Sequence, residues 1–240
     1  MSIDPARAFD RVTGTLQDDP NLIATLEVVD TLNVMVEGAH PILRCPDGCA
    51  RCCLQQVFIS EEEWAILLPA LHRDSTADER RRIVRRARRL LDRKRGPLRR
   101  ALRARNLEDL SRLTMTVDRR RVQRCVLLTN DNLCAGYSGR PMVCRAFGRV
   151  SHNLDNPMLC KIFLDRLSDE GRSHRDLHLP DFGPVRAAYL LGTPEDIGFT
   201  LLPIFVVLHA DADGDLMTEP RQLPRDGDWP VLTREEVALL

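Results

Sequence analysis

Residues 44–53 read Arg44-Cys45-Pro46-Asp47-Gly48-Cys49-Ala50-Arg51-Cys52-Cys53, which places four cysteines within nine residues. A second set begins about seventy residues downstream and completes the eight cysteines of the chain: Cys125, Cys134, Cys144 and Cys160. Thiolate sulfur is a soft ligand, and sites built from cysteine select zinc, iron–sulfur clusters or Cu(I). The pattern therefore predicts that metal binding organises the fold.

The local spacing of the first set brings its thiols together. The four cysteines fall at i, i+4, i+7 and i+8, positions that share one face at helical pitch. Gly48 favours a loop for part of the stretch, and the thiols converge in either conformation. Cys52 and Cys53 are adjacent, and neighbouring thiols rarely both reach one ion. The pair therefore indicates either two metal centres or one ligand with a bystander.

Disulfides are the competing interpretation, because eight is an even number. The chain has 240 residues, and its first residues, 1–5, lack the hydrophobic segment of a secretory signal. We therefore favour metal binding and expect a cytoplasmic location, where a reducing environment keeps thiols available. The longest apolar run, residues 197–208, is interrupted by Gly198, Thr200 and Pro203, so no membrane span is expected.

Composition is that of an ordinary globular protein, with 43% hydrophobic and 29% charged residues and a formal net charge of zero. The charge is unevenly distributed, because residues 73–124 contain 20 Arg and Lys against 7 Asp and Glu, a net charge of +13. This segment is either a footprint for a nucleic acid or an acidic partner, or a solvated face paired with the acidic remainder. We favour the solvated face. Nucleic acid is disfavoured for want of a recognisable motif, and a protein partner on the Arg-rich helices stays open.

The chain predicts a mostly helical α+β fold, with helices around a small cysteine-rich β element that carries a metal centre. Helices are expected at 4–19, 20–40, 60–71, 76–95, 97–105, 183–191 and 193–209, with a helical turn at 144–147. Ser60 with Glu63 and Thr76 with Glu79 match the capping box. A strand is expected at 54–59 and a hairpin of strands at 122–128 and 133–137, which holds Cys125 and Cys134. Residues 166–181 and 211–215 are interpreted as loops.

Three domains are expected from these elements. Residues 1–43 would form N-terminal helices, and residues 44–165 a cysteine-rich metal-binding domain with an Arg-rich helical insertion at about 73–121. Residues 166–240 would form a C-terminal helical extension and tail.

A second motif, Tyr137-x2-Arg140-Pro141-x2-Cys144-Arg145-x-Phe147, accompanies the cysteine cluster. The combination resembles the CxxCxxCC family of zinc- or iron-chelating proteins, the YkgJ type, over about residues 44–161. That family includes the flagellin lysine N-methylases. The first gap here is three residues, where the family name implies two, so Cys45 is the weakest ligand candidate of its cluster.

The resemblance implies a cysteine-ligated centre, either zinc or an iron–sulfur cluster such as 4Fe–4S, with all eight cysteines as candidate ligands. Tyr137, Arg140 and Arg145 would support the centre, since the arginines could offset the charge of bound thiolates and donate to sulfur. Pro141 would stiffen the approach to Cys144. For Tyr137 and Phe147, core packing is an equally good interpretation.

The leading interpretation is a metal-binding protein whose further role is open. If the protein is an enzyme, the resemblance favours a protein-lysine N-methyltransferase that uses S-adenosylmethionine. The sequence offers no glycine-rich strand–turn–helix for that cofactor. A zinc-stapled interaction module, with the Arg-rich helices as its binding face, is the third alternative.

Overall fold

The computed structural model describes residues 21–46, 48–54, 56–96, 98, 102, 124–153, 156–157, 159–177, 179–225 and 229–238. The chain forms two compact units, each made of two chain segments. Unit 1 comprises Met1–Asp47 and Met142–Thr193, and unit 2 comprises Gly48–Pro141 and Pro194–Leu240. The helices expected at 4–19 and 97–105 lie outside the described residues or almost entirely so.

Unit 1 is built on the long helix α2 (Leu22–Ala39), which confirms the helix expected at 20–40. Asn21 caps it, because its side chain accepts a hydrogen bond of 2.8 Å from the backbone N–H of Ala24. The buried side of α2 packs against α6 (Met142–Ala146) and α8 (Gly183–Gly192). These two helices confirm the helical turn near Cys144 and the helix expected at 183–191. A 3-10 turn, η1 (Pro41–Leu43), follows α2 and leads to Cys45.

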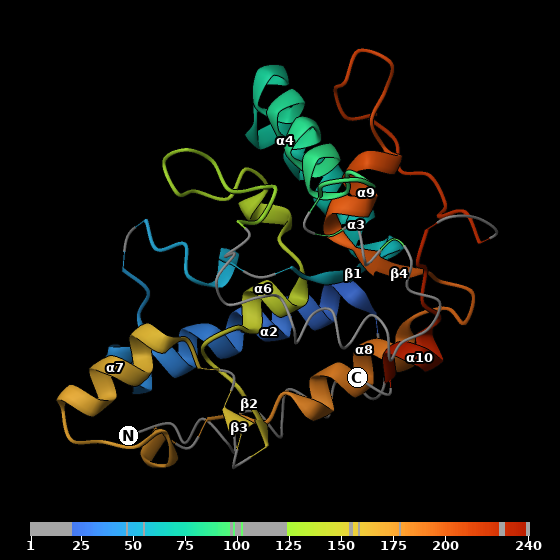
Figure 1. The fold of residues 1–240 in the computed structure, drawn as a ribbon. Coiled ribbons are helices and arrows are strands. Elements are labelled where there is room, and N and C mark those ends of the chain that lie inside the picture. Colours follow the sequence, from blue (N-terminus) through green and yellow to red (C-terminus); the bar gives the residue numbers. More distant parts are fainter. Residues whose placement is uncertain are drawn as a thin grey trace. The chain divides into compact units, whose positions relative to one another are not determined.

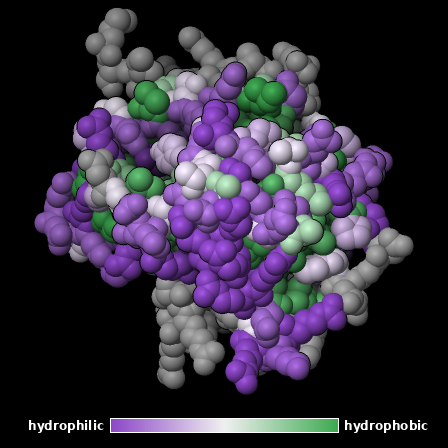
Figure 2. All heavy atoms as spheres, turned by 90° about the horizontal axis from the view of Figure 1, so that it is seen from above, coloured by the Kyte–Doolittle hydropathy of each residue, from purple (hydrophilic) through white to green (hydrophobic). Residues whose placement is uncertain are grey.

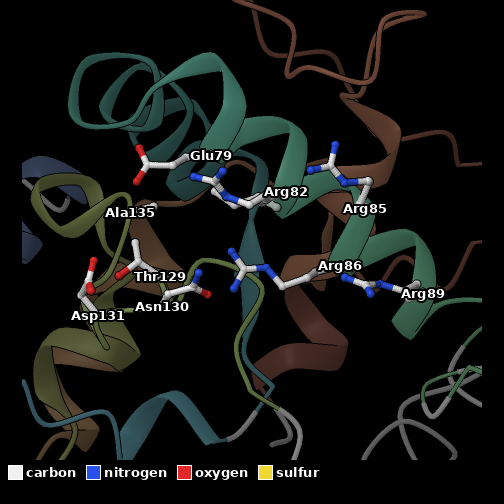
Figure 3. A pocket seen from close by; sticks show the side chains of 10 residues that line it. Glu79, Arg82, Arg85, Arg86, Arg89, Thr129, Asn130, Asp131 and Ala135 are labelled. Carbon is white, nitrogen blue, oxygen red and sulfur yellow. The ribbon is translucent and has the colours of Figure 1, made fainter.

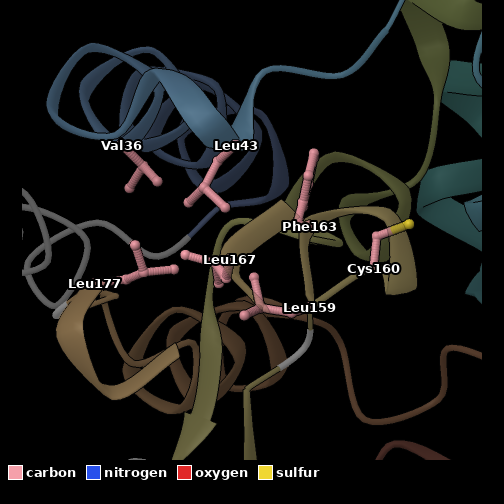
Figure 4. Packing of buried hydrophobic residues seen from close by; sticks show 7 residues of the cluster. All are labelled: Val36, Leu43, Leu159, Cys160, Phe163, Leu167 and Leu177. Carbon is pink, nitrogen blue, oxygen red and sulfur yellow. The ribbon is translucent and has the colours of Figure 1, made fainter. Parts of the chain in front are cut away.

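Helix α7 (Lys161–Asp169) begins directly after Cys160 and completes the core of unit 1. Its apolar side joins the end of α2 and η1 in one buried cluster, drawn in Figure 4: Val36, Leu43, Leu159, Cys160, Phe163, Leu167 and Leu177. The expected loop at 166–181 is therefore partly wrong, because α7 continues to Asp169 and a 3-10 turn, η5 (His174–Leu177), follows. Leu167 and Leu177 supply the apolar anchors that hold these polar-looking segments in place. A small antiparallel sheet, β2 (Ser151–Asn153) with β3 (Asn156–Pro157), precedes α7 in the sequence.

Unit 2 contains a two-stranded antiparallel sheet that joins distant parts of the chain (Figure 1). Strand β1 (Phe58–Ser60) pairs with β4 (Phe199–Leu201), with Ile59 opposite Thr200. A strand was expected at 54–59 and is shorter than expected. The helix expected at 193–209 is wrong in its first part, because β4 precedes α9 (Leu202–Leu208). Thr200 is fully buried and its hydroxyl donates to the Pro230 carbonyl, which secures the extended backbone.

Two helices follow from local signals in the sequence of unit 2. The capping box of Ser60 and Glu63 opens α3 (Glu61–Asp74), and that of Thr76 and Glu79 opens α4 (Ala77–Leu90), as expected. Helix α4 ends five residues earlier than expected. The Asp92 side chain accepts hydrogen bonds from the backbone N–H groups of Lys94 and Arg95, so the chain turns there.

The core of unit 2 lies between α3, α4 and α9. The Trp64 ring of α3 stacks on Phe205 of α9 at 5.5 Å between ring centroids. Ile83, Val84 and Ala87 form the buried stripe of α4, which packs on α9. A short helix, α10 (Arg234–Ala238), closes the described part of this unit.

The fold class is confirmed, since the described residues form eight α-helices and two small two-stranded antiparallel sheets. None of the described helices combines the length and the apolar character that a bilayer crossing needs. On the face drawn in Figure 2, hydrophilic residues make up most of the surface and hydrophobic residues appear in separate patches. The expected boundaries at residues 43 and 165 stay a prediction.

The two capping boxes give a first prediction, because one is buried and one is exposed. Ser60 is fully buried and Glu63 is 5% exposed, whereas Thr76 lies at the surface. We expect Ser60→Ala to lower the free energy of unfolding by about 2 kcal/mol and Thr76→Ala by about 0.5–1 kcal/mol, because water can replace only the exposed cap. Urea unfolding followed by tryptophan fluorescence measures both. An equal or larger loss in Thr76→Ala would contradict this description of the caps.

Candidate metal centre

A short turn presents two cysteines of unit 2. The backbone N–H of Ala135 donates to the Leu127 carbonyl at 2.9 Å, and Leu128 and Cys134 form an isolated antiparallel bridge. Residues 129–132 make the turn, with Asn132 at a φ of 61°. The hairpin expected here is thus reduced to a single bridge, because only this pair of residues makes a strand-like contact. Cys125 and Cys134 still lie on its two arms, as expected.

One backbone hydrogen bond ties this turn to the first cysteine set. The N–H of Cys125 donates to the carbonyl of Cys53 at 2.7 Å. Cys53 lies in the 3-10 turn η2 (Cys52–Leu54), itself closed by a bond of 3.0 Å from the Cys53 N–H to the Ala50 carbonyl. Residues 52–54 and 124–135 therefore meet at the cysteines, although about seventy residues separate them.

The close approach of a further segment completes the surroundings of Cys134. The 3-10 turn η4 (Tyr137–Gly139) packs on α3. A Cβ on Gly139 would lie 2.7 Å from the Ala70 Cβ and 2.9 Å from the Ile66 carbonyl oxygen, so only glycine allows this contact without a shift. Arg140 is thereby placed next to the turn that carries Cys134.

The adjacent thiols of Cys52 and Cys53 point to a common region. Their sulfur atoms are 4.0 Å apart. Two thiolates bound to one tetrahedral zinc at about 2.3 Å would be separated by about 3.8 Å. The spacing is therefore compatible with both sulfurs on one centre, which the sequence alone made look unfavourable.

The environment favours the protonated form of Cys53, Cys125 and Cys134 when no metal is bound, because it raises the pKa of each of these thiols. A hydrogen bond with Cys52, then burial, then repulsion from Cys52, Cys125 and Cys134 raise the pKa of Cys53 far above its usual range. Burial raises the pKa of Cys125 to about 12, and burial raises that of Cys134 as well. A metal would have to displace these protons, as thiolate ligation requires.

Two arginines counteract the burial effect on individual thiols. The positive charge of Arg86 lowers the pKa of Cys125, and that of Arg140 lowers the pKa of Cys134. The guanidinium of Arg140 also lies 4.1 Å from the centroid of the exposed Tyr137 ring. These charges would compensate part of the negative charge of a thiolate-bound metal.

The four sulfurs of Cys52, Cys53, Cys125 and Cys134 form what we call the thiol group of unit 2. Within the described residues, no group of three or more His, Cys, Asp or Glu side chains is positioned to hold a metal ion without rearrangement. The donor type fits zinc or iron, and the 4.0 Å between the Cys52 and Cys53 sulfurs fits a shared centre. Binding of one metal would require these side chains to rotate. The thiols are already close enough for their charges to affect one another's pKa.

The remaining cysteines lie elsewhere in the two units. Cys49 belongs to unit 2 and is half-buried in the loop before η2. Cys45, Cys144 and Cys160 belong to unit 1, where they are exposed, half-buried and buried respectively. Cys160 lies at the start of α7, and Figure 4 shows its sulfur pointing away from Leu167 and Leu177. All eight cysteines are described and none forms a disulfide.

The other residues of the second motif have structural partners in unit 1. Arg145 is 8% exposed and forms an ion pair with Asp30, and its carbonyl accepts a hydrogen bond of 2.9 Å from Asn33. Phe147 packs against the buried cluster of α7. Gly148 follows at a φ of 90°, where a Cβ would meet the Phe163 ring at 2.9 Å. The expected support of a metal by Arg145 therefore stays a prediction.

Two arginines near cysteines were not singled out from the sequence. Arg86 was part of a helix interpreted as a solvated face, and Arg149 follows the second motif by two residues. Arg149 forms an ion pair with Glu37, and its Nη2 lies 3.7 Å from the Cys45 sulfur. No local signal marked either residue, because each contact depends on chain segments far apart in sequence.

Clustered soft thiols with nearby cations define this part of the chain as a cysteine-rich metal-binding domain. Residues 44–161 match the model of the CxxCxxCC family, described as "Putative zinc- or iron-chelating domain", and this part of the chain belongs to that family. No curated protein matches the chain, and no solved structure matches it either.

The burial of the thiol group predicts how fast individual cysteines react in metal-free protein. Cys45 is exposed, whereas Cys125 is half-buried and its thiol stays protonated at pH 8 because burial raises its pKa to about 12. We expect iodoacetamide at pH 8 to label Cys45 about tenfold faster than Cys125 or more. Peptide mass spectrometry over a time course measures both rates. Equal labelling of the two would show that the turn around Cys125 is open.

Proposed function

We propose that the thiol group of unit 2, Cys52, Cys53, Cys125 and Cys134, ligates one metal centre. The observation that carries the proposal is the convergence of these four thiols, fixed by the 2.7 Å bond from the Cys125 N–H to the Cys53 carbonyl. Four thiolates are a complete ligand set for a structural zinc and equally for an iron–sulfur cluster. The zinc- or iron-chelating character of the CxxCxxCC domain supports the same assignment.

The metal would act as a cross-link within unit 2. The η2 turn, the turn at residues 129–132 and the segment to Arg140 would all be held at one point. A zinc ion would supply charge and geometry alone, and an iron–sulfur cluster would add one-electron transfer. Arg86 and Arg140 lie where they can balance the excess negative charge of the thiolates.

The lysine N-methylase alternative gains no support from the described part of unit 2. The two strand-to-helix junctions described in this unit, Ser60 to Glu61 and Leu201 to Leu202, lack the glycines that could admit a nucleotide-like cofactor. An interaction module stapled by zinc remains compatible with the proposed centre. The identity of the metal decides between a redox role and a purely structural one.

Metal analysis of variants tests the ligand assignment. Protein purified without oxygen should contain a constant ratio of metal to protein chain. If the centre is an iron–sulfur cluster, the protein should also contain acid-labile sulfide and be brown. We expect Cys53→Ser and Cys134→Ser each to lose the metal of this centre, because three thiolates bind far more weakly than four. We expect Cys49→Ser, in the same unit, to retain it. The readout is elemental analysis with a visible spectrum.

Full metal content in both Cys53→Ser and Cys134→Ser would refute the assignment. Loss on Cys49→Ser as well would mean that the fifth cysteine of the unit belongs to the centre. Circular dichroism of each variant checks that the helices remain folded.

Removal of the metal should also lower thermal stability. A ligand that binds only the folded state stabilises it by mass action. We therefore expect a chelator such as 1,10-phenanthroline to lower Tm by about 5–10 °C for wild-type protein. Differential scanning calorimetry measures the shift. The Cys134→Ser variant serves as the control, since chelator should leave its Tm unchanged, and an unchanged wild-type Tm would argue against a metal cross-link.

A further inference from the structure

A pocket of about 350 Å³ lies in unit 2 between helix α4 and the turn that follows Cys125 (Figure 3). Four arginines of α4 line one wall, namely Arg82, Arg85, Arg86 and Arg89. The opposite wall consists of Thr129, Asn130, Asp131 and Ala135. Figure 3 shows Arg82 and Arg86 extending from the helix toward this second wall. A helix and a turn from distant parts of the sequence thus enclose a space of small-molecule size.

The walls of the pocket carry excess positive charge. Four arginines face two carboxylates, those of Glu79 and Asp131, which leaves a net charge of +2. The Glu79 carboxylate accepts hydrogen bonds from the N–H and hydroxyl of Thr76 as part of the capping box. The Glu79 carboxylate is thus held by hydrogen bonds at the N-terminus of the helix.

Other arginines of the same helix differ in their partners. Arg80 forms a two-point ion pair with Asp215, and Arg81 pairs with Asp78. Among the ion pairs found within the described ranges, none involves the four arginines of the pocket. The pocket is therefore lined by four arginines that form no ion pair in the described part of the unit.

Arg86 is the most constrained of the four. It is half-buried, and its Nη1 donates to the Leu128 carbonyl. Its Nε is buried and donates to no acceptor in the described part of the chain. Burial and the neighbouring Arg124, Arg82 and Arg89 lower the pKa of its guanidinium, although the nearby Cys125 raises it. A buried donor without an acceptor, held among other cations, is costly unless an anion joins it.

The chemistry of the walls selects the class of anion. Guanidinium groups bind phosphate and carboxylate oxygens through paired hydrogen bonds, and the hydroxyl of Thr129 and the amide of Asn130 can add further hydrogen bonds. A net wall charge of +2 matches a phosphate dianion better than a single carboxylate. The enclosed volume of about 350 Å³ leaves space for a small organic group beside the phosphate.

We propose that this pocket is a binding site for a small phosphate-bearing molecule, with the phosphate held by Arg82, Arg86 and Arg89 opposite Thr129 and Asn130. The site is distinct from the thiol group, so it does not depend on the identity of the metal. It lies on the same turn, because Cys125 and Cys134 flank Thr129 and Asn130 in sequence. A bound phosphate would therefore rest directly against the segment that carries two proposed metal ligands.

Calorimetric titration of the full-length, metal-loaded protein tests the proposal. The probes are inorganic phosphate, AMP as a phosphate ester, and adenosine as the same group without phosphate, all at constant ionic strength in chloride. We expect saturable binding of AMP, of inorganic phosphate or of both, and no binding of adenosine. Binding of phosphate alone would identify a free-anion site, and tighter binding of AMP would identify an ester site. Metal content before and after titration shows that phosphate has not removed the metal.

Matched arginine variants locate the binding. We expect Arg82→Gln and Arg89→Gln each to weaken binding about tenfold, the loss of one charge-assisted contact. Arg88→Gln is the control, because Arg88 is exposed on the same helix and does not line the pocket. Its phosphate binding should stay within about twofold of wild type. Arg86 is not used, since its charge also acts on Cys125.

Three results would overturn the proposal. The first is no saturable binding of inorganic phosphate or AMP at millimolar concentration. The second is an equal loss for Arg88→Gln and Arg82→Gln, which would mean a diffuse basic surface. The third is binding of single-stranded RNA that exceeds AMP binding and falls equally in all three variants, which would assign the helix to a nucleic-acid surface.

Discussion

The hydrogen bond from the Cys125 N–H to the Cys53 carbonyl brings the cysteine-bearing turns of unit 2 together. At 2.7 Å it fixes two turns against each other that the chain separates by about seventy residues. Once they meet, four thiols share one region, and each thiolate would repel the others. The raised pKa of Cys53 reflects its hydrogen bond with Cys52, its burial and that repulsion, in this order. The arrangement is therefore stable with protons on sulfur or with a metal among the thiolates, and a bare set of thiolates would be unfavourable.

The arginines of helix α4 have different partners within unit 2. Arg80 is used in an ion pair with Asp215, and Arg81 pairs locally with Asp78. Arg86 instead lies between the pocket and Cys125, where its charge favours the thiolate. Of the excess of +13 in residues 73–124, the charge of Arg80 is thus paired with an acidic group outside the segment. Four arginines of the segment, including Arg86, line one pocket.

Structural elements that depend on contacts between residues close in sequence could be predicted from the sequence. Both capping boxes and helix α2 depend on contacts within about eight residues. Strand β4 could not be predicted in the same way, because its strand partner, β1, lies about 140 residues earlier and its own residues are as apolar as those of a buried helix. The 4.0 Å distance between the Cys52 and Cys53 sulfurs was missed for a different, local reason. Adjacent side chains usually diverge, and the 3-10 turn that orients these two is closed by Ala50 and Arg51 carbonyls.

Apolar packing already positions the turn that carries Cys125 and Cys134. Val126, Leu127 and Leu128 are each at most 2% exposed, so the turn is anchored in the core without the help of a metal. Burial of three such side chains contributes roughly 5 kcal/mol or more. A small metal-dependent domain lacks such a core and unfolds when the metal leaves. Here the core would set the distance between the turns and the metal would lock the sulfurs, so metal loss acts on the thiol-bearing turns first.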